Sequence, residues 1–94
     1  MTRTMPPFRV LIDKRAEREL LAIPPHVIAR FRAVFEKLEL DPYLPRPQCD
    51  IRVVKGHPRM KAVRVGAYRG LFEVLETEWE VRFMKFGHRR SVYR

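Results

Sequence analysis

The sequence predicts an α+β fold, in which two N-terminal antiparallel helices pack on one face of a small, mainly antiparallel β-sheet. Two observations lead to this class. Up to about residue 40 the apolar residues recur at the helical period, and beyond about residue 50 they recur at the strand period of two. A chain of 94 residues fits one domain, so we expect a single domain over 1–94 with one hydrophobic core.

The first half of the chain is expected to hold a short strand and two helices. Residues 8–12 form the strand, and Asp13 can then cap a first helix that runs to about Ile23. The Pro24–Pro25 pair ends this helix and begins the next, and so short a link makes the two helices antiparallel. One apolar stripe of the second helix is expected in the core: Val27, Ile28, Phe31, Val34, Phe35 and Leu38.

A proline-broken loop at 41–47 separates the helices from four expected strands. These strands cover residues 51–55, 60–65, 69–75 and 80–86. Gly66-Ala67 is a two-residue loop with Gly first, which fits a type II′ turn. This turn places Arg64 directly opposite Arg69.

A second loop at 76–79 fixes the register of the last two strands. It pairs Leu75 with Glu80, Val74 with Val81, Glu73 with Arg82 and Phe72 with Phe83. Apolar residues then meet apolar residues and opposite charges meet, which favours this register.

These registers divide the sheet into two faces. One face is apolar and is expected to meet the helices: Val63, Val65, Phe72, Val74, Val81 and Phe83. The other is open and rich in arginine: Arg64, Arg69, Glu73, Arg82 and Met84. Lys61 falls on the apolar side, near a strand end from which its ammonium group can reach solvent.

The charge of the chain points to a polyanionic partner. The formal net charge is +9 and the pI is about 10.6. Residues 1–51 carry nine Lys and Arg against seven Asp and Glu, whereas residues 52–94 carry eleven against four. Such a balance indicates nucleic acid, an acidic membrane or an acidic protein as the partner. Because the excess lies in the half with the arginine-rich face, we expect a polyanion to bind there.

The compartment is expected to be the cytoplasm. Cys49 is the only cysteine, which excludes an intrachain disulfide and suits a reducing environment. No apolar run is long enough to cross a membrane, and residues 1–7 lack the apolar core of a signal peptide.

The two arginines of the hairpin indicate an anion site. Like charges directly opposite on a sheet repel each other, and a phosphate held between Arg64 and Arg69 would remove that repulsion. The alternative is that both side chains turn into solvent. The chain's last residues add His88, Arg89 and Tyr93 to the same end of the sheet.

Four segments carry a family resemblance: Val54-Lys55-Gly56-His57-Pro58, Arg64-Val65-Gly66-Ala67-Tyr68-Arg69, Phe72-Glu73-Val74 and Gly87-His88-Arg89-Arg90-Ser91-Val92-Tyr93-Arg94. With these segments and the order of its elements, the sequence resembles the RelE/ParE superfamily of type II toxin–antitoxin toxins. The resemblance implies a RelE-like fold and a cognate antitoxin that silences the toxin in a hetero-oligomer. The RelE branch consists of endoribonucleases, or mRNA interferases, which inhibit translation by cutting mRNA, usually on the ribosome. The ParE branch poisons DNA gyrase instead.

The resemblance also implies the site residues. Arg64 and Arg69 match the hairpin arginines of the RelE branch, Arg89 the arginine after the last strand, and Tyr93 the terminal tyrosine. The expected chemistry needs no metal or other cofactor: the RNA 2′-hydroxyl attacks the phosphodiester, arginines stabilise the charge, and Tyr93 gives or takes a proton or stacks on a base. Two positions that are often basic in the family hold Met60 and Ala62 here.

The remaining polar residues are assigned to acid–base chemistry, to structure or to RNA binding. His88 could act as an acid or base near neutral pH, or could be structural. His26 and His57 are expected to be structural. Attraction to the RNA backbone is assigned to five residues: Lys55, Lys61, Arg82, Lys85 and Arg90.

Three hypotheses about function follow from the sequence. The first is a toxin that cuts mRNA on the ribosome. The second is a ParE-like gyrase poison, which the absence of basic residues at Met60 and Ala62 favours. The third is a module that has lost catalysis but still binds RNA or an antitoxin.

Overall fold

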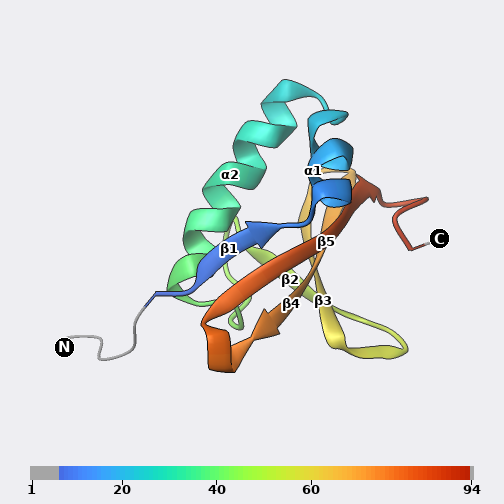
Figure 1. Cartoon of the computed structure of the whole chain (residues 1–94). Coiled ribbons are helices and arrows are strands. Elements are labelled where there is room, and N and C mark those ends of the chain that lie inside the picture. Colours follow the sequence, from blue (N-terminus) through green and yellow to red (C-terminus); the bar gives the residue numbers. More distant parts are fainter. Residues whose placement is uncertain (1–6, 94) are drawn as a thin grey trace.

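The computed structural model describes residues 7–93 and contains two α-helices and five strands. Figure 1 shows the helices side by side over one side of the sheet. In chain order the elements are β1 (Arg9–Ile12), α1 (Lys14–Leu21), α2 (Pro25–Leu40), β2 (Asp50–Val54), β3 (His57–Val65), β4 (Tyr68–Leu75), a short 3₁₀ turn (Glu76–Glu78) and β5 (Glu80–His88). The predicted α+β fold is confirmed.

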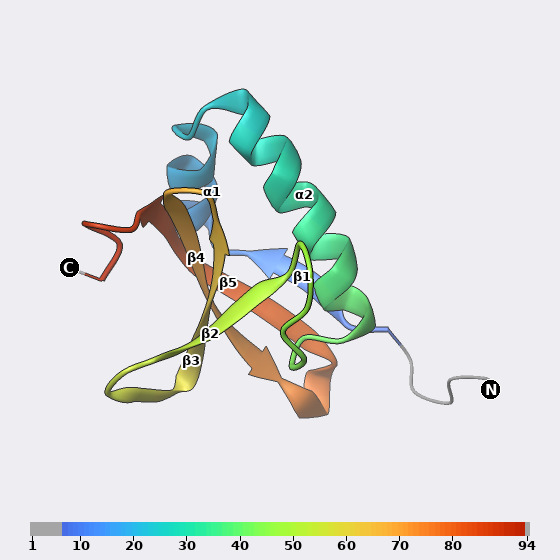
Figure 2. The ribbon, with the colours of Figure 1, turned by 180° about the vertical axis from the view of Figure 1, so that it is seen from behind.

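The five strands form one sheet in the order β1-β5-β4-β3-β2. The neighbours from β5 to β2 are antiparallel, whereas β1 runs parallel to β5 and pairs Val10 with Val81. The sequence predicted a strand at 8–12 but gave it no partner. Viewed from behind in Figure 2, β2 and β3 extend away from the helices, which leaves one side of the sheet uncovered.

The main core fills the space between the helices and the sheet. From α2 it takes Phe31 and Leu38, and from the sheet it takes Val63, Phe72 and Phe83, all fully buried. Burying an aliphatic or aromatic side chain of this size contributes roughly 1.5–3 kcal/mol. The apolar faces expected from the two periodicities therefore meet as predicted.

Both predicted hairpin registers are confirmed. Arg64 pairs with Arg69 and Val65 with Tyr68 across the first turn. Gly66 has a φ of 59° while Ala67 has no positive φ, the combination of a type II′ turn. The second hairpin pairs Glu73 with Arg82 and closes through Trp79, whose φ of 57° is left-handed.

The strand ends differ from the expected ones. His57 and Pro58, which fall between the strands expected at 51–55 and 60–65, already belong to β3. The turn is confined to Lys55 and Gly56, and Gly56 has a φ of 82°. The ladder between β4 and β5 shifts between Leu71 and Phe72, where it leaves one residue of β5 unpaired. Such a bulge turns the side chains that follow it and bends the strand.

A second, smaller apolar cluster lies on the open side of the sheet. Its buried members are Val54, Ala62, Leu71 and Val92, with Met60 packed against them. The sequence predicted a polar, arginine-rich surface on this face. The cluster forms because the chain end folds back over the sheet and buries Val92.

Candidate active site

The end of the chain is folded back by a tight turn after β5. The Arg89 N–H donates to the Ala67 carbonyl at 2.8 Å, which extends the pairing of β5 with the first hairpin. The N–H groups of Ser91 and Val92 both donate to the His88 carbonyl at 2.9 Å. Val92 is 2% exposed and packs in the open-side cluster, so the next residue, Tyr93, is held against the sheet.

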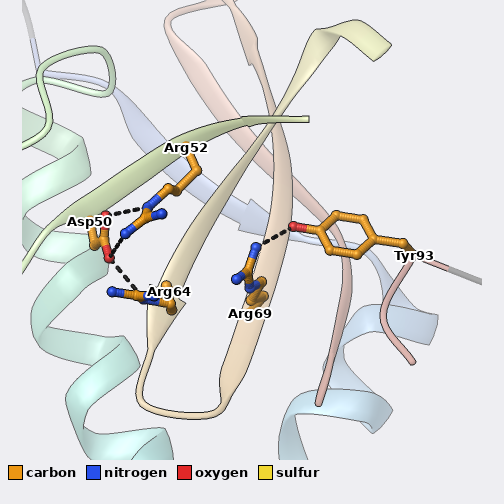
Figure 3. A network of polar contacts seen from close by, with 5 residues as sticks. All are labelled: Asp50, Arg52, Arg64, Arg69 and Tyr93. Carbon is orange, nitrogen blue, oxygen red and sulfur yellow. Dashed lines mark hydrogen bonds and ion pairs between the residues drawn. The ribbon is translucent and has the colours of Figure 1, made fainter. Parts of the chain in front are cut away.

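Tyr93 meets Arg69 of β4 on the open face. Arg69 Nη1 donates a hydrogen bond of 2.8 Å to Tyr93 Oη, and the guanidinium carbon lies 5.7 Å from the centre of the ring (Figure 3). The Arg69 Nε–H is buried but has no acceptor among residues 7–93. A buried donor without a partner costs about 1–3 kcal/mol, so this position of the guanidinium is maintained at a cost in stability.

A groove on the open face borders this pair; we call it the open-face groove. It has a volume of about 610 Å³. Its lining residues are Val53, Val54, Lys55, His57, Met60, Leu71, Met84, Lys85, Val92 and Tyr93. The floor is apolar and the rim carries two lysines, a histidine and a phenol, a combination that suits a flat ring with an attached anion.

Met60 and Ala62, which stand where the family resemblance implies basic residues, lie at or beside this floor. Met60 lines the groove and Ala62 is fully buried in the cluster beside it, beneath the folded chain end. A lysine at position 62 would have to be buried there. The departure from the family pattern therefore fits the way that this chain packs its own terminus.

Arg64 does not join Arg69 and Tyr93, contrary to expectation. Its Nε makes an ion pair of 2.9 Å with Asp50 Oδ2, and Arg52 Nε binds the other oxygen of the same carboxylate at 2.9 Å. Hydrogen bonds from Arg52, with the positive charge of Arg64, hold the pKa of the Asp50 carboxyl below its usual range. Figure 3 shows Arg64 turned toward Asp50 and Arg69 turned toward Tyr93. The repulsion expected between the two arginines is thus relieved by a carboxylate of the chain itself.

The other two candidate catalytic residues lie outside the groove. Arg89 lines a separate cleft together with Arg64. His88 pairs with Tyr68, with the ring centres 5.6 Å apart, and Tyr68 packs against the main core. Residues directly opposite each other share one face of a sheet, so His88 is on the helix-covered side. Its Nδ1 accepts a hydrogen bond from the Arg90 N–H at 3.2 Å, which gives it a structural contact.

The five candidate RNA-binding residues are divided between the two faces. Lys55 and Lys85 line the open-face groove, and His57, expected to be only structural, joins them there. Arg82 lies farther along β5 in an ion pair of 3.4 Å with Glu80, and Arg90 is exposed in the final turn. Lys61 lies opposite the buried Phe72 and lines a different depression, so the structure does not bring it to the groove.

Residues 7–93 contain no helix long and apolar enough to cross a membrane. They also contain no group of three His, Cys, Asp or Glu side chains placed to bind a metal ion. Arg94, the last residue of the C-terminal segment that carries the family resemblance, lies outside the described residues, as do residues 1–6.

Comparison of the whole sequence with known proteins identifies its relatives. The RelE1 protein of Methanocaldococcus jannaschii is 30% identical over 87 residues, which are 93% of this chain and 96% of that protein. The chain belongs to the RelE toxin family. The toxin RelE3 of the same organism is 29% identical over 86 residues, covering 92% of this chain and 96% of its own. No family model matches the sequence.

Solved RelE structures have the same fold as this RelE-family chain. The toxin of the RelB–RelE antitoxin–toxin complex from Methanococcus jannaschii superposes with a TM-score of 0.72 at 28% identity, over 88% of this chain and 94% of that one. The archaeal RelE–RelB complex from Pyrococcus horikoshii gives 0.74 at 25% identity, over 90% and 98%. The RelBE2 complex of Mycobacterium tuberculosis gives 0.74 at 22% identity, over 94% and 98%.

Proposed function

We propose that this RelE-family protein is an endoribonuclease that cuts mRNA on the ribosome and so inhibits translation. The observation that carries the proposal is the contact between Arg69 and Tyr93 beside the open-face groove. The net charge of +9 favours association with mRNA and ribosomal RNA.

Arg69 is the group proposed to stabilise the reacting phosphate. The RNA 2′-hydroxyl gives its proton to solvent water, its oxygen forms a bond to phosphorus as the bond to the 5′-oxygen breaks, and negative charge accumulates on the phosphoryl oxygens. A guanidinium stays protonated throughout and donates to two oxygens at once. Donors fixed in advance at the place where charge develops make the largest contribution in many such sites.

Tyr93 is proposed to donate the proton that the departing 5′-oxygen needs. Its hydroxyl oxygen accepts the hydrogen bond from Arg69, which leaves the hydroxyl hydrogen free to point elsewhere. The adjacent guanidinium stabilises the negative charge that remains on the phenol oxygen after the transfer. The phenol is 47% exposed, so RNA can reach it.

The groove is proposed to hold a base next to the cut. Met60, Leu71 and Met84 offer an apolar floor to a base that has left its stack, while Lys55 and Lys85 on the rim attract the backbone. This arrangement selects single-stranded RNA, because a paired base cannot enter the groove.

The partner is proposed to be a cognate antitoxin. The Mycobacterium tuberculosis and Methanococcus jannaschii structures described above are toxin–antitoxin complexes, and the Pyrococcus horikoshii structure is a RelE–RelB complex. We infer that this protein likewise forms a cytoplasmic hetero-oligomer in which the antitoxin suppresses cutting.

The proposal is tested by adding the protein to a translation extract and mapping new mRNA 5′ ends by primer extension. The wild-type protein is expected to produce such ends, and Tyr93→Phe is expected to slow their appearance about 10²- to 10⁴-fold, the contribution of a positioned acid. Tyr43→Phe is the matched control, since Tyr43 is 41% exposed and belongs to the loop after α2. Intact mRNA together with trapped DNA breaks in a gyrase supercoiling assay would instead identify a ParE-like poison. Ribosome and RNA binding without new ends would identify a binding module.

A second variant tests whether the folded chain end positions Tyr93. Val92→Ala removes two methyl groups from a side chain that is 2% exposed and should loosen the hold on Tyr93. Misplacement of a catalytic group by about 1 Å can cost on the order of 100-fold in rate, so we expect cutting to slow by roughly 10- to 100-fold. Leu21→Ala, on a side chain that is 64% exposed in α1, should leave the rate unchanged. A wild-type rate in Val92→Ala would show that the tail does not need this anchor.

A further inference from the structure

A second polar site lies between α2 and the turn of the first hairpin; we call it the arginine cleft. It has a volume of about 710 Å³ and is separate from the open-face groove, with which it shares no residue. Three arginines line it, from three different parts of the fold: Arg30 of α2, Arg64 of β3 and Arg89 after β5. Gln48 and Asp50 complete its polar wall.

The side chain of Arg30 reaches the tip of the hairpin. A Cβ built on Gly66 would lie 3.6 Å from Arg30 Nη1, so the guanidinium lies over the turn. Among residues 7–93 neither Arg30 nor Arg89 forms an ion pair. Two cations are therefore held beside Arg64 without a carboxylate of their own.

The cleft already binds one anionic group, the carboxylate of Asp50. This carboxylate contacts the Nε of Arg64, which leaves both terminal amino groups of that guanidinium available to another oxyanion. Three arginines outnumber the single acid in the cleft, so its net charge is positive. The guanidinium groups that Asp50 does not occupy can therefore bind a further anion with several oxygens.

We propose that the arginine cleft binds a backbone phosphate of the RNA next to the one at Arg69. This inference rests on the proposed function, since the cleft would hold the same strand that is cut at Tyr93. Arg64 and Arg69 are directly opposite on neighbouring strands, yet Arg64 turns to Asp50 in the cleft and Arg69 turns to Tyr93. The hairpin would thus bind two phosphates of one strand, one on each arginine.

The position of the cleft favours a nucleic-acid backbone as its occupant. Guanidinium forks bind phosphate and carboxylate alike, but Arg64 of the cleft pairs across the hairpin with Arg69 of the proposed cutting site. The substrate of that site carries a phosphate at every nucleotide. The carboxylate of Asp50 then competes with the RNA phosphate for the guanidinium of Arg64.

The test measures RNA binding without cutting. A single-stranded oligoribonucleotide that is 2′-O-methylated throughout lacks the attacking hydroxyl, and its Kd is measured by fluorescence anisotropy over a range of salt. Arg30→Ala is expected to raise the Kd several-fold and to reduce the slope of log Kd against log salt by about 0.7, the value for one phosphate contact on a single strand. Asp50→Asn is expected to lower the Kd, because it removes the competing charge.

Arg32→Ala is the matched control, because Arg32 is exposed on the same helix and does not line the cleft. A Kd and salt slope for Arg30→Ala equal to those of Arg32→Ala would overturn the inference. The inference would also be overturned if Arg30→Ala lost binding to an oligoglutamate peptide but bound RNA as the wild-type protein does. That result would assign the cleft to an acidic protein partner. Because the probe cannot be cut, failure of the proposed nuclease activity would leave this result readable by itself.

Discussion

Arg69→Ala is expected to lower the rate at which new mRNA 5′ ends appear in a translation extract by about 10²- to 10³-fold. The change removes the guanidinium beside Tyr93 Oη together with the Nε–H that has no other partner. Loss of one preorganised donor to a developing negative charge has an effect of this size in comparable sites. Primer extension at several times after addition gives the rate.

Two controls separate the chemistry of Arg69 from its charge. Arg69→Lys keeps the positive charge but loses the planar fork, so an intermediate rate is expected. Arg18→Ala removes one exposed arginine from α1 and should cut at the wild-type rate. If folded Arg69→Ala cut as fast as Arg18→Ala, Arg69 would have no part in the reaction.

Gly70→Ala is expected to lower the free energy of unfolding by about 1–3 kcal/mol, the usual cost of overpacking a core. A Cβ at this position would lie 2.7 Å from ring carbons of both Phe83 and Phe86. Those two rings are stacked, with centres 4.9 Å apart, and are buried, so neither can move aside without disturbing the main core. Urea denaturation followed by circular dichroism measures the change.

Gly87→Ala is the matched control in the same ladder, since Gly87 pairs with Arg69 next to Gly70. A Cβ there would meet Val92 at 3.6 Å, an ordinary van der Waals contact. We therefore expect Gly87→Ala to change the urea concentration at the midpoint of unfolding only slightly. Equal midpoints for the two variants would show that the phenylalanine pair does not close over Gly70.

The antiparallel part of the fold could be predicted because the strand period and the turn residues indicate the same strand pairings. The strand period places Phe72 and Val81 on one face, and the Gly66 turn fixes the register that sets Arg64 opposite Arg69. Each pairing joins neighbouring segments of the chain. The parallel pairing of β1 with β5 could not be found in this way, since it joins segments about seventy residues apart that no turn connects.

The site was only partly predictable, because it depends on the directions of long side chains. Register gives the face on which Arg64 lies but not its partner, and Asp50 of a third strand determines where its guanidinium points. The fold of the chain end was also missed. The sequence gives two indications of this fold of the chain end. Val92 is an apolar residue among polar neighbours, and the strand on which it packs carries Met60 and Ala62. These three residues indicate a buried chain end once they are considered together.

The most direct measurement is cutting of an mRNA in which the nucleotide on the 5′ side of a mapped cut carries a single 2′-deoxy sugar. If the groove beside Arg69 and Tyr93 supports attack by the 2′-oxygen, cutting at that bond should disappear, while the unmodified message is cut and leaves a 2′,3′-cyclic phosphate. Continued cutting at the deoxy position would contradict this chemistry and would require a different nucleophile.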